Sequence, residues 1–524
     1  MSKRRLIFYS DARHTHIYAY DPPLRVEDAV APVDDVAGTG VDTFVYGFGA
    51  GLTMYHNTKV GETWAEHLIK AGKTTFREPE IWNTFPFWRA YSNIKSLRDR
   101  GLDLLELLTD RAHEKGLAMW GSIRTNHGQD PAFIDTADNS TFKIEHPELH
   151  LKTVPGQPFN WAYSEVRAER LALFEEAVTN YDLDGMEIDF VFSQYLFERG
   201  EVEANKHLVT EFMADARRIA DKAAADKGKP FTLGARVFPT PESNAATGLD
   251  IADWIADGLV DFLVPAVYGP IQMDVNLPFE WLVDLAAGTP CEVYPALQDK
   301  VFSVHTSGIH QVDRRIYEHA ATPEHFRAGA AAYWAKGADG IYLPWFDWPV
   351  DANEKQILSE IHDPDLLSEK PKHYWSPVRD VDGDYEGYSS QLPVTLQTGV
   401  EASEQVVSLY LADDSARSDV RLRLKLTGSV AADVMSVTLN GAELDWKTSR
   451  VTRHGGGGDI FAWSDFPIEP DMFRRGVNEI GVAVLSRPEN LVASVILQSV
   501  EVLVDYPGNA ANTEFDRISL GRRL

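Results

Sequence analysis

Two carboxylates stand at alternate positions of a short apolar segment that runs from Gly185 to Phe190. In a β-strand successive side chains point to opposite faces, so Glu187 and Asp189 share one face of this segment. Burying a carboxylate is costly unless partners compensate, and that face therefore needs a polar destination. The mouth of an α/β barrel provides one, because side chains near the carboxyl end of each strand line its active-site cup. We expect Asp189 at the mouth and Glu187 one layer deeper, and for both a structural role is the alternative.

Hydrolysis of a glycosidic bond is one reaction that two carboxylates can catalyse, and it usually needs a second acid across the bond from the first. The two groups lie about 5–5.5 Å apart in retaining enzymes and about 6.5–9.5 Å apart in inverting ones. Two further acids follow other predicted strands, namely Glu242 and Asp347. Asp347 stands between aromatic residues and could equally hold a sugar hydroxyl. The predicted catalytic residues are therefore Asp189, Glu242, Glu187 and Asp347.

Further polar and aromatic residues follow the predicted strands at the same end. Each could bind substrate hydroxyls, and each could equally serve the structure. Arg236 stands close to the end of its strand, where it could keep Asp189 ionised or form a purely structural ion pair. The predicted substrate-binding residues are Asp11, His14, His16, Arg124, His127, Arg236, Tyr268 and Trp345.

Short apolar runs alternate with helical patterns over the first two thirds of the chain, which is typical of parallel βα units. Leu208, Phe212, Ala216 and Ile219, for example, recur at helical spacing. Eight parallel strands with intervening helices close most economically into a (β/α)8 TIM barrel of the α/β class. The expected strands are Leu6–Ser10, Thr43–Phe48, Leu117–Ile123, Gly185–Val191, Thr232–Val237, Phe262–Val267, Glu292–Leu297 and Gly340–Trp345.

Three connections after predicted strands are long, at residues 49–100, 125–160 and 298–322. Long loops are usually lids or binding loops, and these would lie at the active-site end of the barrel. They are rich in aromatic residues and histidines, whose amphipathic side chains suit sugar rings. Small cores beneath the loops are the alternative for any one of them. The residues are Tyr55, His56, Trp64, Trp82, Phe85, Phe87, Trp88, His127, Phe159, His305 and His310, with Trp161 just beyond the second connection.

The pattern becomes all-β after a helix expected at residues 353–362. Leucines at positions 422, 424 and 426 alternate with basic residues, as in a half-buried strand. Asn440-Gly441 follows another alternating run and predicts a hairpin turn. We predict a catalytic barrel over residues 1–362, a linker over 363–387, a β-sandwich over 388–506 and a weakly ordered tail over 507–524.

Composition excludes several classes of partner. The 524 residues carry 50 Lys and Arg against 79 Asp and Glu, and the net charge of −29 works against binding nucleic acid or an anionic membrane surface. Cys291 is the only cysteine, which excludes an intramolecular disulfide and suits a reducing compartment. The apolar run from Leu6 to Tyr9 is too short for a signal peptide, and no run approaches the ~18 residues of a membrane span. We expect a soluble cytoplasmic protein, and a homo-oligomer is left open.

Motifs in both halves of the chain carry a resemblance to known families. Tyr181 to Phe190, with Glu165-Val166-Arg167 at a preceding helix start, resembles the fourth-strand region of barrel glycoside hydrolases, especially glycosyl-hydrolase-like family 10. This resemblance covers roughly residues 5–350 and implies a (β/α)8 glycoside hydrolase. Segments 439–441 and 476–480 resemble galactose-binding-like β-sandwich domains, which implies a carbohydrate-binding or a structural role. Segments similar to later barrel units are Gly234–Val237, Gly248–Ile255, Gly258–Asp261 and Gly337–Tyr342.

The chitinase-type family 18 pattern Asp-Gly-x-Asp-x-Asp-x-Glu gives a sharper comparison. Aligned on Asp184, its middle acids fall on Glu187 and Asp189, and its final acid, the proton donor, falls on Val191. Substrate-assisted chitinase chemistry is therefore disfavoured. Starch-degrading barrels pair an aspartate on the fourth strand with a glutamate after the fifth, and this resemblance favours Glu242 as the second acid.

Two other function classes stay open. His14-Thr15-His16 resembles the start of metal-dependent amidohydrolase barrels, but Arg236 and Tyr268 stand where such sites need histidine ligands. A catalytically inactive barrel that binds carbohydrate is the other alternative. We predict a glycoside hydrolase that cleaves an oligosaccharide from the chain end by a two-carboxylate mechanism. No organic cofactor is expected, because neither a dinucleotide fingerprint nor a P-loop is present. No metal ligand is assigned.

Overall fold

The computed structural model describes most of the 524-residue chain. The described ranges are 4–11, 16–49, 51–70, 81–128, 136–193, 195–267, 273–307, 313–346, 349–378, 387–398, 403–413, 419–456, 459–469 and 471–506. The side chains of residues 16, 81–85, 302–307, 313–319, 454–456 and 459–460 are not among the described parts.

Eight parallel strands of the described chain form one sheet in the order β10-β1-β2-β3-β4-β5-β6-β7. The sheet closes into a barrel because Ala296, just beyond β7, pairs in parallel with Tyr342 in β10. The predicted fold class is therefore confirmed, and each expected segment overlaps one strand of the barrel. The strands are β1 (Arg5–Asp11), β2 (Thr43–Gly47), β3 (Ala118–Arg124), β4 (Gly185–Asp189), β5 (Thr232–Val237), β6 (Phe262–Pro265), β7 (Glu292–Val293) and β10 (Gly340–Leu343).

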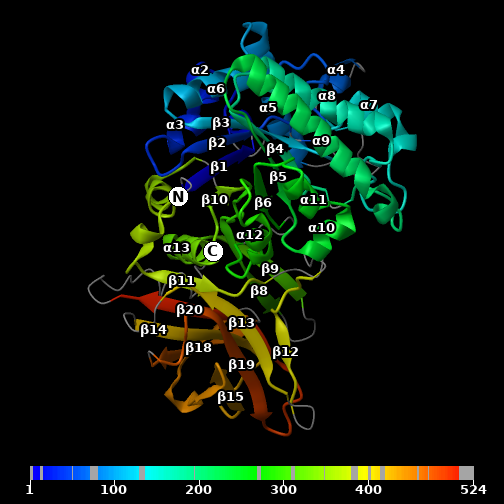
Figure 1. Cartoon of the computed structure of the whole chain (residues 1–524). Coiled ribbons are helices and arrows are strands. Elements are labelled where there is room, and N and C mark those ends of the chain that lie inside the picture. Colours follow the sequence, from blue (N-terminus) through cyan, green and yellow to red (C-terminus); the bar gives the residue numbers. More distant parts are fainter. Residues whose placement is uncertain are drawn as a thin grey trace.

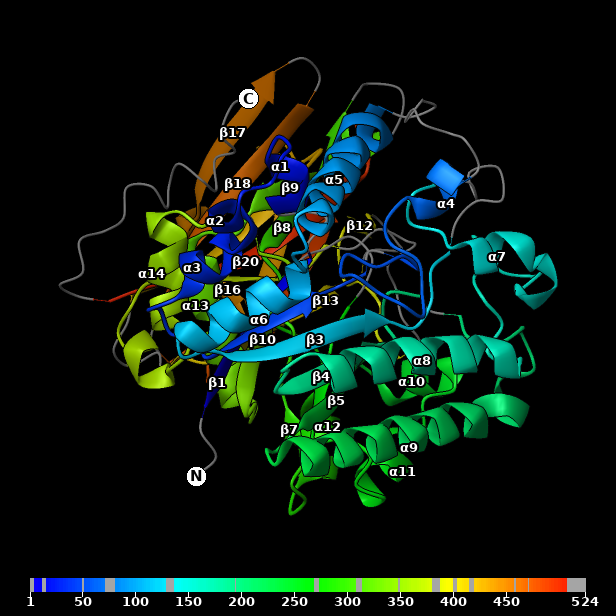
Figure 2. The same cartoon turned by 90° about the horizontal axis from the view of Figure 1, so that it is seen from above.

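Helices cover the outside of the barrel, and α8 and α9 lie side by side along one flank (Figure 2). Helix α9 buries Phe212, Ala216 and Ile219 of the predicted apolar stripe and ends at Gly228, whose φ of 66° suits glycine. The barrel helices are α1 (His16–Ala19), α2 (Val26–Ala29), α3 (Ala31–Val36), α4 (Glu66–Lys70), α5 (Ile81–Asp99), α6 (Leu104–Glu114), α7 (Thr141–Glu145), α8 (Ser164–Asn180), α9 (Val202–Lys227), α10 (Pro241–Thr247), α11 (Ile251–Ala256), α12 (Glu280–Ala286), α13 (Pro323–Ala335) and α14 (Ala352–Glu360), with short 3-10 turns η3 (Pro147–Leu149) and η4 (Pro364–Leu367).

Two of the long connections predicted as lids or binding loops contain packed structure. The connection after β7 contains an antiparallel hairpin, β8 (Lys300–Ser307) and β9 (Asp313–Ala320), and β8 lies close to strands of the C-terminal domain. In the connection after β2, Tyr55 and Trp64 are 1% exposed and pack in a small core with Phe87. These aromatics therefore stabilise the connection, and the prediction that they line a sugar site is wrong for them.

Two antiparallel sheets form the C-terminal β-sandwich below the barrel (Figure 1). One sheet has the order β11-β20-β14-β18-β17 with β12 also paired to β20, and the other has the order β13-β19-β15-β16. The strands are β11 (Lys372–Trp375), β12 (Val394–Leu396), β13 (Gln405–Leu411), β14 (Asp419–Thr427), β15 (Val434–Leu439), β16 (Ala442–Leu444), β17 (Arg450–Gly456), β18 (Asp459–Ile468), β19 (Gly476–Ser486) and β20 (Val495–Asp505), with a 3-10 turn η8 (Trp446–Thr448).

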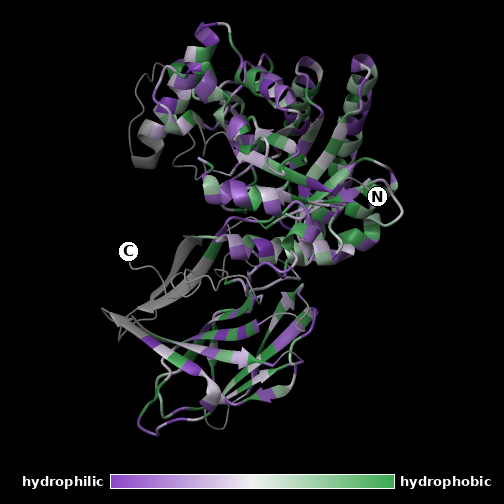
Figure 3. Ribbon diagram, turned by 90° about the vertical axis from the view of Figure 1, so that its left-hand side faces the viewer, coloured by the Kyte–Doolittle hydropathy of each residue, from purple (hydrophilic) through white to green (hydrophobic). Residues whose placement is uncertain are grey.

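Alternation of hydrophobic and hydrophilic residues is visible along the sandwich strands (Figure 3). The predicted turn at Asn440-Gly441 joins β15 to β16 with positive φ at both residues. Strand β14 departs from the half-buried prediction, because Arg423 and Lys425 are buried as well as the leucines. Arg423 forms a bidentate ion pair with Asp465. This pair offsets the free-energy cost of burying the cation on the face of β14 opposite the leucines.

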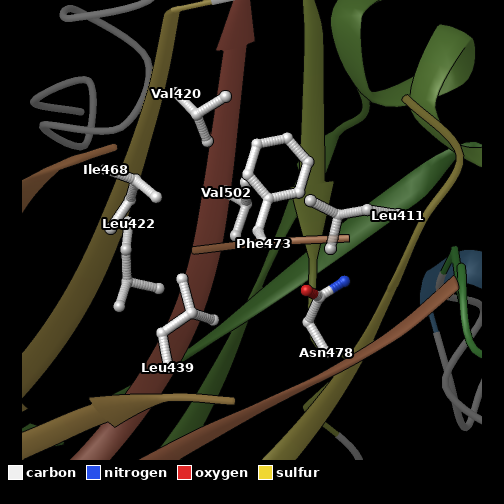
Figure 4. Close-up of a pocket in the computed structure, with 8 residues that line it drawn as sticks. All are labelled: Leu411, Val420, Leu422, Leu439, Ile468, Phe473, Asn478 and Val502. Carbon is white, nitrogen blue, oxygen red and sulfur yellow. The ribbon is translucent and has the colours of Figure 1, made fainter. Parts of the chain in front are cut away.

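Among the residues that the structure describes, the cavity found between the two sheets is too small for a sugar. This cavity has a volume of about 10 Å³. Apolar side chains such as Leu422 and Phe473 line it together with the polar Asn478 (Figure 4). Such a volume holds roughly one water molecule. The sandwich core is therefore structural, and any ligand of this domain must bind elsewhere.

The barrel and the sandwich are packed against each other. Strand β11 belongs to the sandwich sheet although it lies in the range 363–387 predicted as a linker, and α13 packs on it. Asn276 of the barrel bonds to the backbone of Ser408 and Tyr410 in β13 at 2.8 and 2.9 Å. In the part of the chain that is described, no helix is long and apolar enough to cross a bilayer.

Candidate active site

Strand register brings the charged residues of three neighbouring strands to one level at the carboxyl end of the barrel. Asp189 in β4 is opposite Arg124 in β3 on one side and Arg236 in β5 on the other. One layer deeper, Glu187 is opposite Ser122. Cations and carboxylates thus alternate around this part of the barrel, because parallel pairing in register places residues with the same inward orientation side by side.

Asp189 is held from two directions. Its Oδ1 accepts hydrogen bonds from the backbone amides of Val191 and Phe192 at 2.9 and 3.1 Å. Its Oδ2 lies 3.4 Å from Nη1 of Arg236, and no hydrogen bond from the described residues reaches that oxygen. The side chain is 2% exposed. Asp189 therefore has one oxygen fixed by the backbone and one oxygen available to a further partner.

Arg236 joins both acids of β4. Its Nη2 donates to Glu187 Oε1 at 2.8 Å and to the Tyr342 hydroxyl at 2.7 Å. Its guanidinium also lies 4.6 Å from the ring centre of Tyr9. Burial lowers the pKa of Arg236, but the charges of Asp189 and Glu187 outweigh burial and raise that pKa well above its usual value. The predicted pairing of Arg236 with Asp189 is present, and the shorter contact is to Glu187.

Glu187 is completely buried and receives hydrogen bonds from Arg236 and from the Ser122 hydroxyl, the latter at 2.7 Å. Burial raises the pKa of Glu187. The positive charge of Arg236 lowers this pKa, the negative charge of Asp189 raises it, and the net effect is a raised pKa. Glu187 therefore keeps a proton to a higher pH than an ordinary glutamate does.

A second ion pair lies beside the first. Arg124 donates to Asp11 at 2.5 Å, and both side chains are 2% exposed. The ring of half-buried Phe192 covers the Arg124 guanidinium at 3.6 Å. The same ring also stacks with the His127 ring, with the ring centres 5.9 Å apart. Because the Phe192 amide also binds Asp189, this residue links the two ion pairs.

Aromatic residues complete the described part of the mouth. Tyr9 lies 6.1 Å from half-buried Trp345 and 6.2 Å from Tyr342, measured between ring centres. Burial, together with the charge of Asp11, raises the pKa of the Tyr9 hydroxyl. The sequence analysis missed Tyr9 and Tyr342. Strand periodicity could have found Tyr9, because it stands two residues before Asp11 and therefore on the same face.

The remaining predicted site residues divide into three groups. His127 pairs with Asp138 at 3.2 Å, with both side chains 7% exposed. Glu242 is exposed in the first turn of α10, and a methyl group added at Gly387 would come within 2.5 Å of its Oε2. Its carboxylate thus faces the junction with the sandwich, and the structure shows no contact between it and Asp189. Three predicted site residues are not among those that the structure describes, namely His14, Tyr268 and Asp347, and the side chain of His16 is not described either.

Among the residues that the structure describes, no group of three His, Cys, Asp or Glu side chains is arranged to hold a metal ion. His14 and the side chain of His16, which suggested the amidohydrolase alternative, are outside that set. The alternation of arginines and acids around Asp189 suits proton transfer and hydrogen bonding to a neutral polar substrate.

Comparison with known proteins gives only distant likenesses. No family model and no curated protein sequence matches the chain. Among solved structures, it is similar to a glycoside hydrolase family 18 N-acetylglucosaminidase from Paenibacillus barengoltzii, with 12% identity, a TM-score of 0.38, and 68% of this chain and 100% of that chain covered. It is also similar to the PgaB (BpsB) glycoside hydrolase domain from Bordetella bronchiseptica, with 9% identity, a TM-score of 0.43, and 68% and 99% covered.

A third likeness is to the multi-modular chitinase ChiW from a Paenibacillus species, with 12% identity and a TM-score of 0.40. That alignment covers 94% of this chain and 56% of the other, so the chain spans little more than half the length of the larger enzyme. These TM-scores are too low to support a function for this chain. The proposed function therefore depends on the residues at the barrel mouth.

Proposed function

We propose that the chain is a glycoside hydrolase that cleaves an oligosaccharide at the carboxyl end of the barrel, with Asp189 as the residue that touches the sugar. One observation carries the proposal: Asp189 Oδ1 is fixed by two backbone amides while Oδ2 accepts no hydrogen bond from the described residues. A fixed carboxylate with one available oxygen is the arrangement that a nucleophile or a general base requires.

Arg236 and Glu187 support this carboxylate. Arg236 places a positive charge 3.4 Å from Asp189 Oδ2 and orients the acid through its second contact with Glu187. Because Glu187 is completely buried, its role is to position Arg236 and to hold a proton, and it does not touch the substrate.

The second catalytic acid is proposed to be Asp347, with Glu242 as the alternative. Asp347 follows Trp345 by two residues, and the Trp345 ring contacts Tyr9 at the mouth. The Glu242 carboxylate instead faces Gly387 at the domain junction. Comparison of Asp347→Asn with Glu242→Gln decides between them, because only loss of the true partner abolishes turnover.

A screen of 4-nitrophenyl glycosides with the purified protein tests the activity. Hydrolysis of at least one glycoside, and its loss by at least a thousandfold in Asp189→Asn, is expected. Asp182→Asn is the matched control, because Asp182 is exposed at the opposite end of β4 and pairs with Lys229. Full activity in Asp189→Asn overturns the assignment.

Exo action and a cytoplasmic location remain parts of the proposal. Products of a hexasaccharide should appear one unit at a time from the non-reducing end, whereas an initial mixture of internal fragments contradicts exo action. Fractionation of the source cells checks the location.

An inactive carbohydrate-binding barrel is the second candidate, favoured by the 2% exposure of Asp189 and its ion-paired surroundings. It predicts no turnover of any glycoside by the wild type, with equal sugar affinity in the wild type and in Asp189→Asn.

A further inference from the structure

A groove separate from the barrel mouth lies where the barrel meets the sandwich. It has a volume of about 410 Å³, in the range of small-molecule sites. Its walls come from α13, from the segment that follows α14, and from the ends of β11, β13 and β20. Residues far apart in the sequence therefore meet here only because the two domains are packed together.

The floor of the groove is a buried polar cluster. Lys372 Nζ lies 2.8 Å from Asp413 Oδ1, and the two side chains are 2% and 6% exposed. Asp413 also accepts hydrogen bonds from the hydroxyls of Tyr374 and Tyr506. Because Lys372 and Asp413 neutralise each other and their bonds fix both, the floor is rigid and carries no net charge.

The rim has both aromatic and charged groups. Trp334 lines the groove half-buried, with its indole N–H bonded to the Ile361 carbonyl at 3.0 Å. Arg475 is exposed and forms no ion pair with the residues described. Glu369, also exposed, has a φ of 58°, a backbone conformation that costs free energy in a residue other than glycine.

This chemistry excludes two classes of ligand and fits a third. A polyanion would meet Asp365 and Glu369 at the rim, and a purely apolar ligand would remove solvent from the charged groups of the rim. A sugar satisfies both requirements, since its hydroxyls bond to carboxylate and guanidinium groups while its C–H faces lie on aromatic rings.

We propose that this junction groove binds a neutral oligosaccharide segment, outside the barrel mouth. The choice of a sugar rests on the proposed hydrolase activity, because an enzyme that cleaves oligosaccharides gains local substrate concentration from a second site.

Calorimetric titration of the Asp189→Asn protein tests the groove without turnover. The probes are neutral oligomers of two to six glucose or N-acetylglucosamine units. Glu369→Gln with Arg475→Ala should weaken binding at least tenfold or remove one site per chain, and Trp334→Phe should weaken it less. Arg450→Ala is the matched control, because Arg450 is exposed and forms no ion pair among the described residues. Unchanged melting temperatures show that the variants are folded.

Three outcomes overturn the groove: no oligomer binds, the double variant binds as its parent does, or Arg450→Ala loses affinity equally. The same measurements distinguish failure of the groove proposal from failure of the hydrolase proposal. If no glycoside is cleaved but oligomer binding persists in Asp189→Asn and is lost in the double variant, the groove stands and the activity does not. If glycosides are cleaved and the double variant binds normally, the reverse holds.

Discussion

Arg236 bridges Glu187 and Asp189 from the neighbouring strand, with Nη2 2.8 Å from Glu187 Oε1 and Nη1 3.4 Å from Asp189 Oδ2. All three side chains are at most 5% exposed. This bridge makes Arg236 necessary for the barrel to accommodate two acids on one strand, and it connects the stability of the fold to the chemistry at its mouth.

Removal of Arg236 should destabilise the protein strongly. Arg236→Ala leaves two buried acids without their cation, and loss of one partner of a buried ion pair costs about 3–5 kcal/mol. Arg236→Lys keeps the positive charge, so it should destabilise the protein less than Arg236→Ala does. It should still destabilise the protein, because lysine lacks the planar fork that reaches both acids. Urea unfolding measures both. The exposed Arg450→Ala should change the free energy of unfolding by no more than about 0.5 kcal/mol, and an equal effect of Arg236→Ala would contradict the bridge.

Glu187 should make stability depend on pH. Its pKa is raised above the ordinary 4.5, so the folded state binds the proton more tightly than the unfolded state. Ionisation therefore costs stability, and the wild type should lose free energy of unfolding relative to Glu187→Gln as pH rises from about 4.5 through the raised pKa. Urea unfolding at pH 4 to 8 measures the difference between the two proteins. A difference that is constant, or that changes in favour of the wild type, would refute the raised pKa.

Glu176 should show the opposite dependence. Burial raises its pKa, but hydrogen bonds from His56, Thr58 and the Lys59 amide outweigh burial and lower the pKa to about 2. The contribution of the ionised Glu176 to the free energy of unfolding is fully present above the ordinary pKa of 4.5. It is lost as the pH falls from 4.5 toward 2. Glu176→Gln should therefore be destabilised by about 1–3 kcal/mol at pH 7 and match the wild type near pH 2.

Denaturant midpoints of the two proteins at several pH values check this prediction. The same gap between them at pH 7 and at pH 2.5 would show that Glu176 does not act through its charge.

Close packing at the mouth gives a test independent of catalysis. A methyl group at Gly47 would lie 2.5 Å from the Tyr9 hydroxyl and 3.1 Å from the ring carbon that bears it. Gly47→Ala should cost about 1–3 kcal/mol by overpacking, and Tyr9→Phe should recover part of this loss because the nearest atom is removed. A double-mutant cycle on the free energy of unfolding measures the coupling. Additive effects of the two substitutions would show that the residues are not in contact.

The sequence by itself determined the barrel. Apolar runs at strand length, separated by helical periodicities, leave few other ways to bury eight strands, and strand alternation alone set Glu187 and Asp189 on a common face. The sandwich strands and the Asn440-Gly441 turn followed from the same local rules. These predictions held because period and turn chemistry are properties of neighbouring residues.

Only the tertiary structure decided which partners each side chain found. Arg423 and Lys425 alternate with leucines as solvent-facing residues do, yet they are buried because Asp465 and aromatic rings of β18 cover them. The aromatic residues after β2 pack on each other, and Glu242 faces the domain junction. Strand register placed Arg236 between two acids, and domain packing created the junction groove. Contacts between distant segments depend on the register and packing of whole elements, which no local pattern encodes.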